Sequence, residues 1–299
     1  MPWLKNVLFV LVGMAVLGSM LGACGPASSS ASSGIKVVAA ENFYGDIVKQ
    51  LGGAHVSVTS ILSDPNVDPH EFESNFNNAK AVGNARLIVA NGGGYDNWID
   101  KLLSSAPKAE RSVIKGSDLA LPQKLPDNEH IWYDVDNMDV IAEKVTEQLI
   151  TLDPAHTSDF STNLQTFKQS LQAIHQKMDE IKARYAGTPI GLTETIYLYQ
   201  AQPMGLKIMT PFAFEKAMAE GNDPPADSVV TTDNQVKQKQ IKVLIYNVQT
   251  TSNVTTKLQD DAKAQHLPVV AVSETMPTTK TYQTWMLDQL NALEAALAK

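Results

Sequence analysis

The sequence predicts an α/β protein of two lobes, each a mainly parallel β-sheet flanked by helices, joined by one long rigid α-helix. From residue 35 onward, short β-rich runs alternate with helical segments, a pattern typical of parallel sheets. These runs form two sets of four, one in each half of the chain. Between the sets lies one long apolar stripe with helical spacing. A chain of 299 residues is long enough to bury two cores of modest size.

The first 23 residues have the pattern of a lipoprotein signal peptide. The segment MPWLK carries one Lys and precedes the apolar run NVLFVLVGMAVLGSM, which is shorter than the roughly 20 residues that span a bilayer. The following LGAC resembles a lipobox, in which Cys24 would be lipidated, and GPASSSASSG is typical of a flexible tether. The alternative is an ordinary buried cysteine in a retained helix. We therefore expect residues 24–34 to anchor the protein outside the cytoplasm, on the outer face or periplasmic side of the cell membrane.

An N-terminal lobe is expected over residues 35–150. It contains four strand candidates, IKVVAA (35–40), VSVTSIL (56–62), RLIVAN (86–91) and RSVIKG (111–116).

A long linking helix is expected over residues 151–187. Eight apolar residues recur at alternating intervals of four and three, namely Phe160, Leu164, Phe167, Leu171, Ile174, Met178, Ile181 and Tyr185. Pro154 near the start and Gly187 just after the end stand where helices tolerate them. The stripe could be a coiled-coil dimer seam, but its bulky Phe and Tyr and its α/β flanks favour packing against the chain's own lobes. We therefore expect a monomer.

A C-terminal lobe is expected over residues 188–299. It contains four strand candidates, PIGLTE (189–194), LKIMTP (206–211), KVLIYN (242–247) and PVVAVSE (268–274).

The charge and the cysteine content favour a cation as the ligand. The formal net charge is −8, and removing residues 1–23 takes away one Lys and no acid, which gives −9. An acidic chain argues against a nucleic-acid partner, which would need a basic surface. Cys24 is the only cysteine, so any metal site in the folded part must use nitrogen and oxygen ligands.

Four potential metal ligands follow the carboxyl ends of predicted strands, where ligands collect in open α/β sheets. His70 follows VSVTSIL, His130 lies beyond the fourth strand, and Glu194 and Glu274 close two strands of the second half. Two imidazoles and two carboxylates give a charge of −2 opposite a divalent cation. Without a cation the two carboxylates would repel each other and their pKa values would rise. Each residue taken alone could instead be a surface or capping residue.

Other residues were considered for supporting roles. Three carboxylates could accept the free N–H of a ligating imidazole, namely Asp68, Glu129 and Asp134. His55 and His266 each stand just before a strand, on the amino side of the sheet, and no role is predicted for them. His156 and His175 lie in the long helical segment and are interpreted as solvated.

Several motifs resemble those of the zinc- and manganese-binding solute-binding lipoproteins of metal ABC importers. The matching segments run in that family's order from about residue 35 to residue 298, namely DPHEFES, NGGGYDNW, EHIWYDVDN, TETIYLYQAQPMGLKIMTP, EGNDPP, IYNVQTTS and VVAVSETMP. The resemblance implies a fold of two α/β lobes on one long helix, Mn²⁺ or Zn²⁺ as the transported ligand, and a cognate permease with its ATPase as partners.

Position by position, the resemblance makes His70 and His130 the ligands of the first lobe. Glu194 stands where many zinc-binding members have a third histidine and many manganese-binding members have a glutamate. Glu274 falls near the family's final carboxylate. Zinc-specific members often carry a His- and Asp-rich loop, whereas residues 101–129 contain no histidine. The choice between Mn²⁺ and Zn²⁺ stays open.

Three other functions were weighed. A metallohydrolase would need an open coordination position and a base, and the sequence has neither an HExxH nor a Ser/His/Asp motif, so we expect no enzyme. Two alternatives remain, a surface adhesin and a binder of an organic metal chelate on the same architecture. The segment NGGGYDNW lacks the glycine spacing of nucleotide-binding loops and is interpreted as a tight turn.

Overall fold

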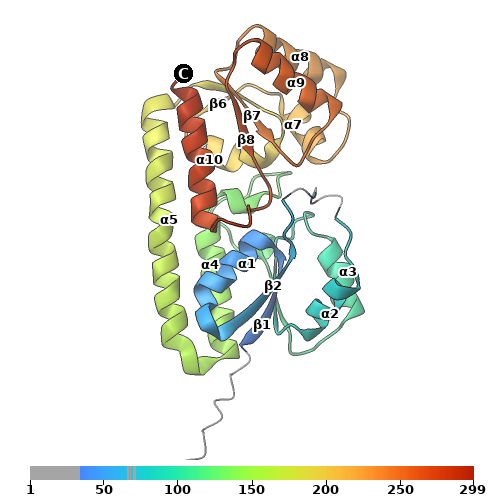
Figure 1. The fold of residues 1–299 in the computed structure, drawn as a ribbon, viewed down its shortest axis with the longest axis vertical. Helices are drawn as coiled ribbons and strands as arrows, with labels where there is room; N and C mark the ends of the chain where they lie inside the picture. Colours follow the sequence, from blue (N-terminus) through green and yellow to red (C-terminus); the bar gives the residue numbers. More distant parts are fainter. Residues whose placement is uncertain (1–33, 66, 68, 70–71) are drawn as a thin grey trace, which may run out of the picture. The chain divides into compact units, whose positions relative to one another are not determined.

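The computed structural model describes residues 34–65, 67, 69 and 72–299 (Figure 1). Three residues to which the sequence analysis gave a role lie outside the described residues, namely Cys24, Asp68 and His70, and so do the predicted signal peptide (1–23) and all but the last residue of the predicted tether (24–34). Among the described helices, none is long and apolar enough to cross a membrane.

The N-terminal lobe is a parallel four-stranded sheet with the order β2-β1-β3-β4. Its strands are β1 (Ile35–Glu41), β2 (Val56–Leu62), β3 (Leu87–Ala90) and β4 (Ser112–Lys115). Its helices are α1 (Asn42–Gly52), α2 (Phe76–Asn84), α3 (Trp98–Ser105) and α4 (Val135–Leu152), with 3₁₀ turns η1 (Gly53–His55), η3 (Gly116–Asp118) and η4 (Ile131–Tyr133). The four predicted strands are all present, because each is a short run of Val, Ile and Leu that the helices on either face of the sheet can bury.

The C-terminal lobe repeats this plan with the order β6-β5-β7-β8, again all parallel. Its strands are β5 (Pro189–Leu192), β6 (Lys207–Ile208), β7 (Val243–Asn247) and β8 (Val269–Val272). Its helical elements are η6 (Thr195–Tyr197), α6 (Leu198–Ala201), α7 (Phe212–Ala219), α8 (Ala226–Lys237), α9 (Asn253–Ala264) and α10 (Tyr282–Leu297). Two parallel sheets flanked by helices confirm the predicted fold class.

The strand β6 is much shorter than the predicted segment 206–211. Two residues pair with β5, and the ladder then stops because the Thr210 hydroxyl, rather than a main-chain carbonyl, accepts the N–H of Leu192 at 2.9 Å. Pro211 follows with no N–H to donate and leads into α7.

The long helix α5 (Thr157–Tyr185) begins after the 3₁₀ turn η5 (Pro154–His156) and runs alongside both lobes (Figure 1). Its apolar stripe packs against α1, α4 and α10 of the same chain. Five of the eight stripe residues are buried and the other three are half-buried against the same core, so the stripe serves intramolecular packing as predicted.

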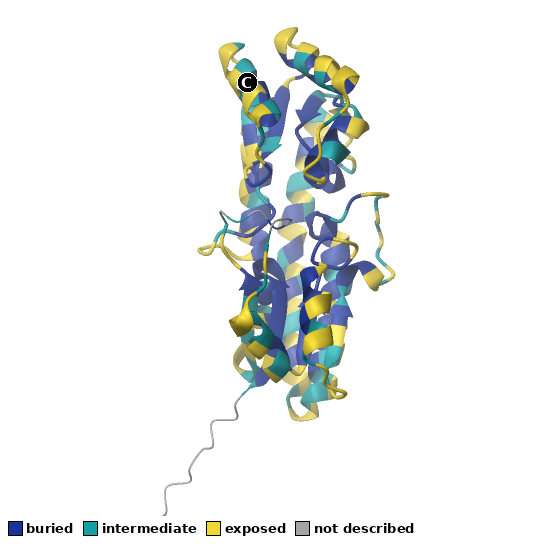
Figure 2. Cartoon of the chain, turned by 90° about the vertical axis from the view of Figure 1, so that its right-hand side faces the viewer, coloured by how far each residue is buried: buried dark blue, intermediate teal, exposed yellow. Residues whose placement is uncertain are grey.

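One apolar core extends through both lobes by way of α5 and α10. It includes Phe43 of α1, Leu171 of α5 and Ile190 of β5. The rings of Phe43 and Trp285 of α10 lie 6.0 Å apart, so an element of the second half packs directly on the first lobe. Figure 2 shows the buried residues following the sheets and the inner faces of the helices. Because both lobes share this core, their relative motion would disturb packed side chains.

Candidate metal site

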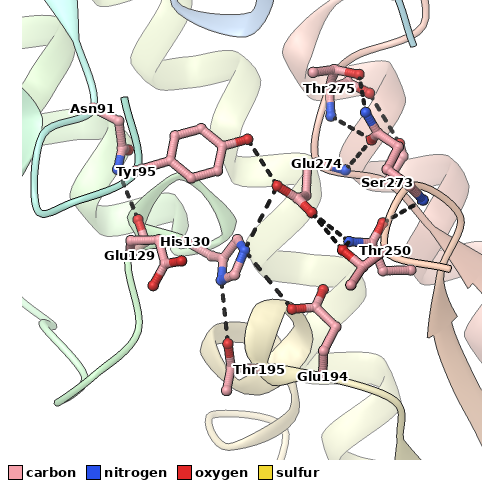
Figure 3. A network of polar contacts seen from close by, with 12 residues as sticks. Asn91, Tyr95, Glu129, His130, Glu194, Thr195, Thr250, Ser273, Glu274 and Thr275 are labelled. Atoms are coloured by element: carbon pink, nitrogen blue, oxygen red, sulfur yellow. Dashed lines mark hydrogen bonds and ion pairs between the residues drawn. The ribbon is translucent and has the colours of Figure 1, made fainter. Parts of the chain in front are cut away.

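Three of the four predicted ligands meet in one buried group. His130, Glu194 and Glu274 each offer a ligand atom, and these atoms all lie within 4.8 Å of one another (Figure 3). The side chains are 0 to 2% exposed. The fourth predicted ligand, His70, lies outside the described residues. The four-residue ligand set therefore stays a prediction, of which the structure brings three members together.

The parallel sheets explain why residues so far apart in sequence come together. Glu194 stands two residues after β5, and Glu274 stands two residues after β8. Both strands pair with β7, so their carboxyl ends lie at the same edge of the second sheet. His130 precedes the turn η4, which leads into α4 of the first lobe. The site is thus built from both lobes.

The distances suit a metal ion better than a direct ion pair. Nε2 of His130 lies 3.9 Å from Oε2 of Glu194 and 4.0 Å from Oε2 of Glu274. These separations exceed a hydrogen bond. Ligand atoms of a tetrahedral site with bonds of 2.0–2.2 Å are about 3.3 Å apart. Movements of less than about 1 Å would therefore bring the three atoms around one ion.

Glu274 is held as a carboxylate by three donors. The Tyr95 hydroxyl donates to one oxygen at 3.0 Å, while the Asn247 amide and the Thr250 hydroxyl donate to the other at 2.6 and 3.1 Å (Figure 3). Hydrogen bonds to the charged form favour that form. These three hydrogen bonds favour the carboxylate form of Glu274, which is the form that binds a cation.

Glu194 has the opposite environment. Within the described residues its carboxyl oxygens receive no well-formed hydrogen bond, and the Ile196 N–H and the Asn247 amide lower its pKa only in part. Burial raises its pKa well above the usual value, and the charge of Glu274 raises it further. Glu194 therefore keeps a proton more easily than an exposed glutamate does. A cation that binds Glu194 must displace this proton, so metal affinity should rise with pH.

The His130 ring is oriented by Asn128. Oδ1 of Asn128 accepts from the Nδ1–H of His130 at 2.9 Å and from its backbone N–H at 3.1 Å. The amide of Asn128 in turn donates to the carbonyl of Thr195 at 2.8 Å. With Nδ1 engaged, Nε2 is left to face the two carboxylates, which is the tautomer that a metal ligand needs.

Asn128 replaces the carboxylates that were predicted to orient the imidazole. Asp134 does not serve His130, because its carboxylate caps α4 by accepting from the N–H of Asn137 at 2.9 Å. Burial raises the pKa of Asp134 to about 6. The backbone carbonyl of Glu129 accepts from the Asn91 amide at 2.9 Å (Figure 3). The third predicted carboxylate, Asp68, lies outside the described residues.

The NGGGYDNW segment forms the predicted tight turn. Gly92, Gly93 and Gly94 all have positive φ, a conformation that favours glycine. The carboxylate of Asp96 accepts from the backbone N–H groups of Asn91 and Gly92 at 2.7 and 2.8 Å and so fixes the turn. The turn presents Tyr95 to Glu274.

A pocket of about 500 Å³ lies against the first-lobe side of the site. Asn128, Glu129 and Ile131, which surround His130 in sequence, line it together with Asp127 and Glu220. Carboxylates at the rim of a pocket attract cations. Lys124 also lines this pocket, and none of the three ligands does, so the pocket adjoins the buried group without opening onto it.

A second carboxyl pair lies at the end of β1 and gives the first testable prediction. Glu41 is fully buried, and its pKa is raised well above normal by burial, then by the charge of Asp96 and by a hydrogen bond shared with Asp96. A raised carboxyl pKa gives stability that is present below the unfolded pKa and lost as pH rises. Glu41→Gln should therefore increase the free energy of unfolding at pH 8 by about 1 kcal/mol and change it little at pH 4.

Urea unfolding at the two pH values measures this difference. The exposed Glu110→Gln serves as control and should change stability at neither pH. A Glu41→Gln variant that is less stable than the parent at pH 8 would show that the charged carboxylate is required there.

Sequence reasoning did not identify the residues that orient the ligands. Asn128 was not singled out, and Tyr95, Asn247 and Thr250 were noted only within longer motifs. Their polar side chains next to strand ends were a usable signal, since Asn247 is the last residue of β7. The contact of Tyr95 with Glu274 joins residues of different lobes, and no local pattern reveals it.

Comparison with solved structures shows the same fold. The chain superposes on the periplasmic zinc-binding protein TroA from Treponema pallidum with a TM-score of 0.74 at 19% identity, covering 88% of this chain and 99% of that one. It superposes on the solute-binding protein FpvC from Pseudomonas aeruginosa, solved in complex with Mn²⁺, with a TM-score of 0.73 at 18% identity, covering 89% and 99%.

Comparison with characterised sequences gives relatives of the same kind. The manganese-binding lipoprotein MntA of Halalkalibacterium halodurans is 26% identical over 203 residues, 66% of this chain and 67% of that protein. The metal ABC transporter substrate-binding lipoprotein FimA of Streptococcus parasanguinis is 30% identical over 187 residues, 58% of this chain and 60% of that protein. The aligned part thus spans about three fifths to two thirds of these relatives.

The sequence profile of one family matches residues 37–296, and that family is described as zinc-uptake complex component A, periplasmic. The match covers nearly the whole described chain and confirms the resemblance that the motifs indicated. It also confirms the prediction that the protein is no enzyme, because the family consists of solute-binding proteins of ABC importers. The chain belongs to the family described as zinc-uptake complex component A, periplasmic.

Proposed function

We propose that this protein captures a divalent transition metal ion, Mn²⁺ or Zn²⁺, between its two lobes and delivers it to a cognate ABC permease and its ATPase. One observation carries the proposal. A fully buried imidazole and two fully buried carboxylates, drawn from both lobes, point their ligand atoms at one another without hydrogen-bonding each other. Such an arrangement is costly unless a cation fills it.

The donor chemistry supports a transition metal. Imidazole suits Zn²⁺ and its neighbours, whereas Ca²⁺ and Mg²⁺ prefer sites made of oxygen alone. His70 is proposed as the second imidazole and fourth ligand, which would make the ligand charge −2. The relatives support the choice as well, since one is named a manganese-binding lipoprotein and one structural neighbour a zinc-binding protein.

The location follows from the N-terminal segment. Lipidation of Cys24 after loss of residues 1–23 would tie the protein to the membrane, with residues 24–34 as a tether. Two of the relatives cited above are named lipoproteins, which supports an extracytoplasmic, membrane-anchored protein. A monomer is proposed, because the apolar stripe of α5 is covered by the chain itself. An adhesive role is the alternative, and two solved structures of this fold are described as laminin-binding proteins.

The proposal is tested by the metal dependence of thermal stability. Residues 25–299, stripped of metal, should gain stability from Mn²⁺ or Zn²⁺ and much less from Ca²⁺ or Mg²⁺. An ion that binds only the folded state adds about 4 kcal/mol at a thousandfold excess over its Kd. His130→Ala should remove the gain from Mn²⁺. His266→Asn is the control, because His266 is exposed, has φ 56°, and lies outside the site.

Two results would contradict metal capture in the cleft. One is a chain that no transition metal stabilises, which would favour an organic ligand or adhesion. The other is a Mn²⁺ response that His130→Ala leaves intact.

A further inference from the structure

A second group of potential metal ligands lies on the first lobe, away from the group of His130, Glu194 and Glu274, which is called the cleft site below. His55 ends the turn η1, and His156 ends the turn η5 just before α5. Their rings stack with centroids 3.8 Å apart and planes at 22°. One ligand atom from each of His55, His156 and Asp153 lies within 4.8 Å of the other two. Two segments that are distant in sequence, η1 and the connection between α4 and α5, thus place two imidazoles and a carboxylate at one spot.

Two carboxylates already hold these imidazoles. Oδ2 of Asp153 lies 2.7 Å from Nδ1 of His156, and Oδ2 of Asp159 lies 2.9 Å from Nε2 of His55. Asp159 accepts from the Nε2–H of His55, which leaves the Nδ1 of that ring with a lone pair. Nδ1 of His156 and Oδ2 of Asp153 share one proton, and an ion that binds both atoms must displace it. Carboxylates that orient imidazoles in this way are the usual partners of histidine ligands in metal sites.

We propose that His55, His156 and Asp153 form a second site for a zinc-like divalent ion, with Asp159 orienting His55. The two Asp carboxylates contribute −2, which matches a divalent cation. Imidazole ligands select Zn²⁺, Ni²⁺ or Cu²⁺ over Mn²⁺, whose preference is for oxygen. Stacked rings must turn before both can ligate one ion. The side chains are 24 to 37% exposed, so the room for this rotation exists.

This second site is separate from the cleft. His55 precedes β2, whereas the cleft residues follow the carboxyl ends of strands. The seven residues of β2 span about 23 Å at about 3.3 Å per residue. The two sites therefore lie at opposite ends of the first sheet, and each can bind an ion without the other. The outer site is open to solvent, while the cleft group is buried.

An ion at this place would clamp the first lobe to the long helix. It would join the start of β2 to the connection between α4 and α5, where Phe160 of α5 already packs edge-on against His55 at 5.6 Å. The site is thus placed to stabilise the base of the linking helix, a role that does not require release of the ion.

The number of bound ions tests this proposal. The purified full chain, freed of metal and titrated with Zn²⁺ or with Mn²⁺ alone, should bind two Zn²⁺ and one Mn²⁺. His156→Ala should reduce Zn²⁺ from two to one and leave Mn²⁺ at one. His55→Gln should do the same, which guards against a folding defect in one variant. His175→Ala is the matched control and should keep two Zn²⁺, because His175 lies on α5, forms an ion pair with Asp136 at 3.4 Å, and has no second imidazole beside it among the described residues.

The test separates the outer site from the cleft. In Glu194→Gln, one Zn²⁺ should remain, and adding His156→Ala should remove it even if the cleft turns out to bind nothing. A chain in which both His156→Ala and His55→Gln still bind two Zn²⁺ would overturn the proposal. The proposal would also be overturned if the parent chain bound only one Zn²⁺ and Glu194→Gln removed that ion.

Discussion

Glu194→Gln is expected to stabilise the metal-free protein at pH 8 and to weaken its metal binding by about 100-fold. The first effect arises because burial and the charge of Glu274 raise the pKa of Glu194 by more than the Ile196 N–H and the Asn247 amide lower it. The second arises because a ligand and one negative charge are lost. Removing even an orienting partner of a ligand costs 10- to 100-fold in affinity, so the loss of the ligand itself should lie at the upper end.

The pH dependence gives the sign of the first effect. A carboxyl whose folded pKa is raised contributes stability that is fully present below its unfolded pKa and is lost as pH rises through the folded value. Glutamine has no such loss. Glu194→Gln and the parent should therefore unfold at similar urea concentrations at pH 4, and the variant should be more stable at pH 8 by about 1–3 kcal/mol.

Glu215→Gln provides the matched control. Glu215 on α7 is also buried with a raised pKa, but it does not belong to the ligand group, and burial alone causes the shift. It should gain stability at pH 8 and keep the parent's response to Mn²⁺ and Zn²⁺. If Glu194→Gln also kept the full metal response, Glu194 would be a buried acid and no ligand.

The positions of Glu194 and Glu274 could be predicted because the rule behind them is local. Each follows a short β-rich run, and the carboxyl ends of parallel strands gather at one edge of a sheet. The structure gives β2 the predicted limits and the other strands similar ones, since runs of Val, Ile and Leu bounded by polar residues mark buried strands clearly. The length of β6 was predicted wrongly because a side-chain hydroxyl, that of Thr210, takes over a bond of the ladder.

Contacts between distant segments could not be predicted from one sequence. His55 was assigned no role and His156 was interpreted as solvated, yet their rings stack, because the turn before β2 meets the connection before α5 only in the folded chain. Asn128 was missed for a related reason. Asn128 hydrogen-bonds to both His130 and Thr195, and Thr195 belongs to the other lobe.

Trp132→Ala is expected to have the largest effect on stability of the substitutions considered. Trp132 is fully buried behind the metal site, stacked on Phe43 with centroids 4.8 Å apart and packed on Tyr95 at 4.7 Å. Truncating a buried Trp or Phe to Ala costs about 3–5 kcal/mol, because apolar contacts are lost and a cavity remains. Urea unfolding without metal at pH 7 measures this cost.

The same substitution should also weaken metal binding, because Trp132 supports both sides of the site. Its ring contacts the His130 ring edge-on at 5.1 Å and the ring of Tyr95, whose hydroxyl donates to Glu274. Loosening one ligand and one orienting partner should reduce affinity by about 10- to 100-fold in a calorimetric titration with Mn²⁺.

Phe214→Ala is the control, since Phe214 is equally buried but belongs to a separate core of the second lobe. It should cost about as much stability and leave affinity unchanged. Equal losses of affinity in both variants would mean that general destabilisation, and not the packing of Trp132 against His130, lowers the affinity for Mn²⁺.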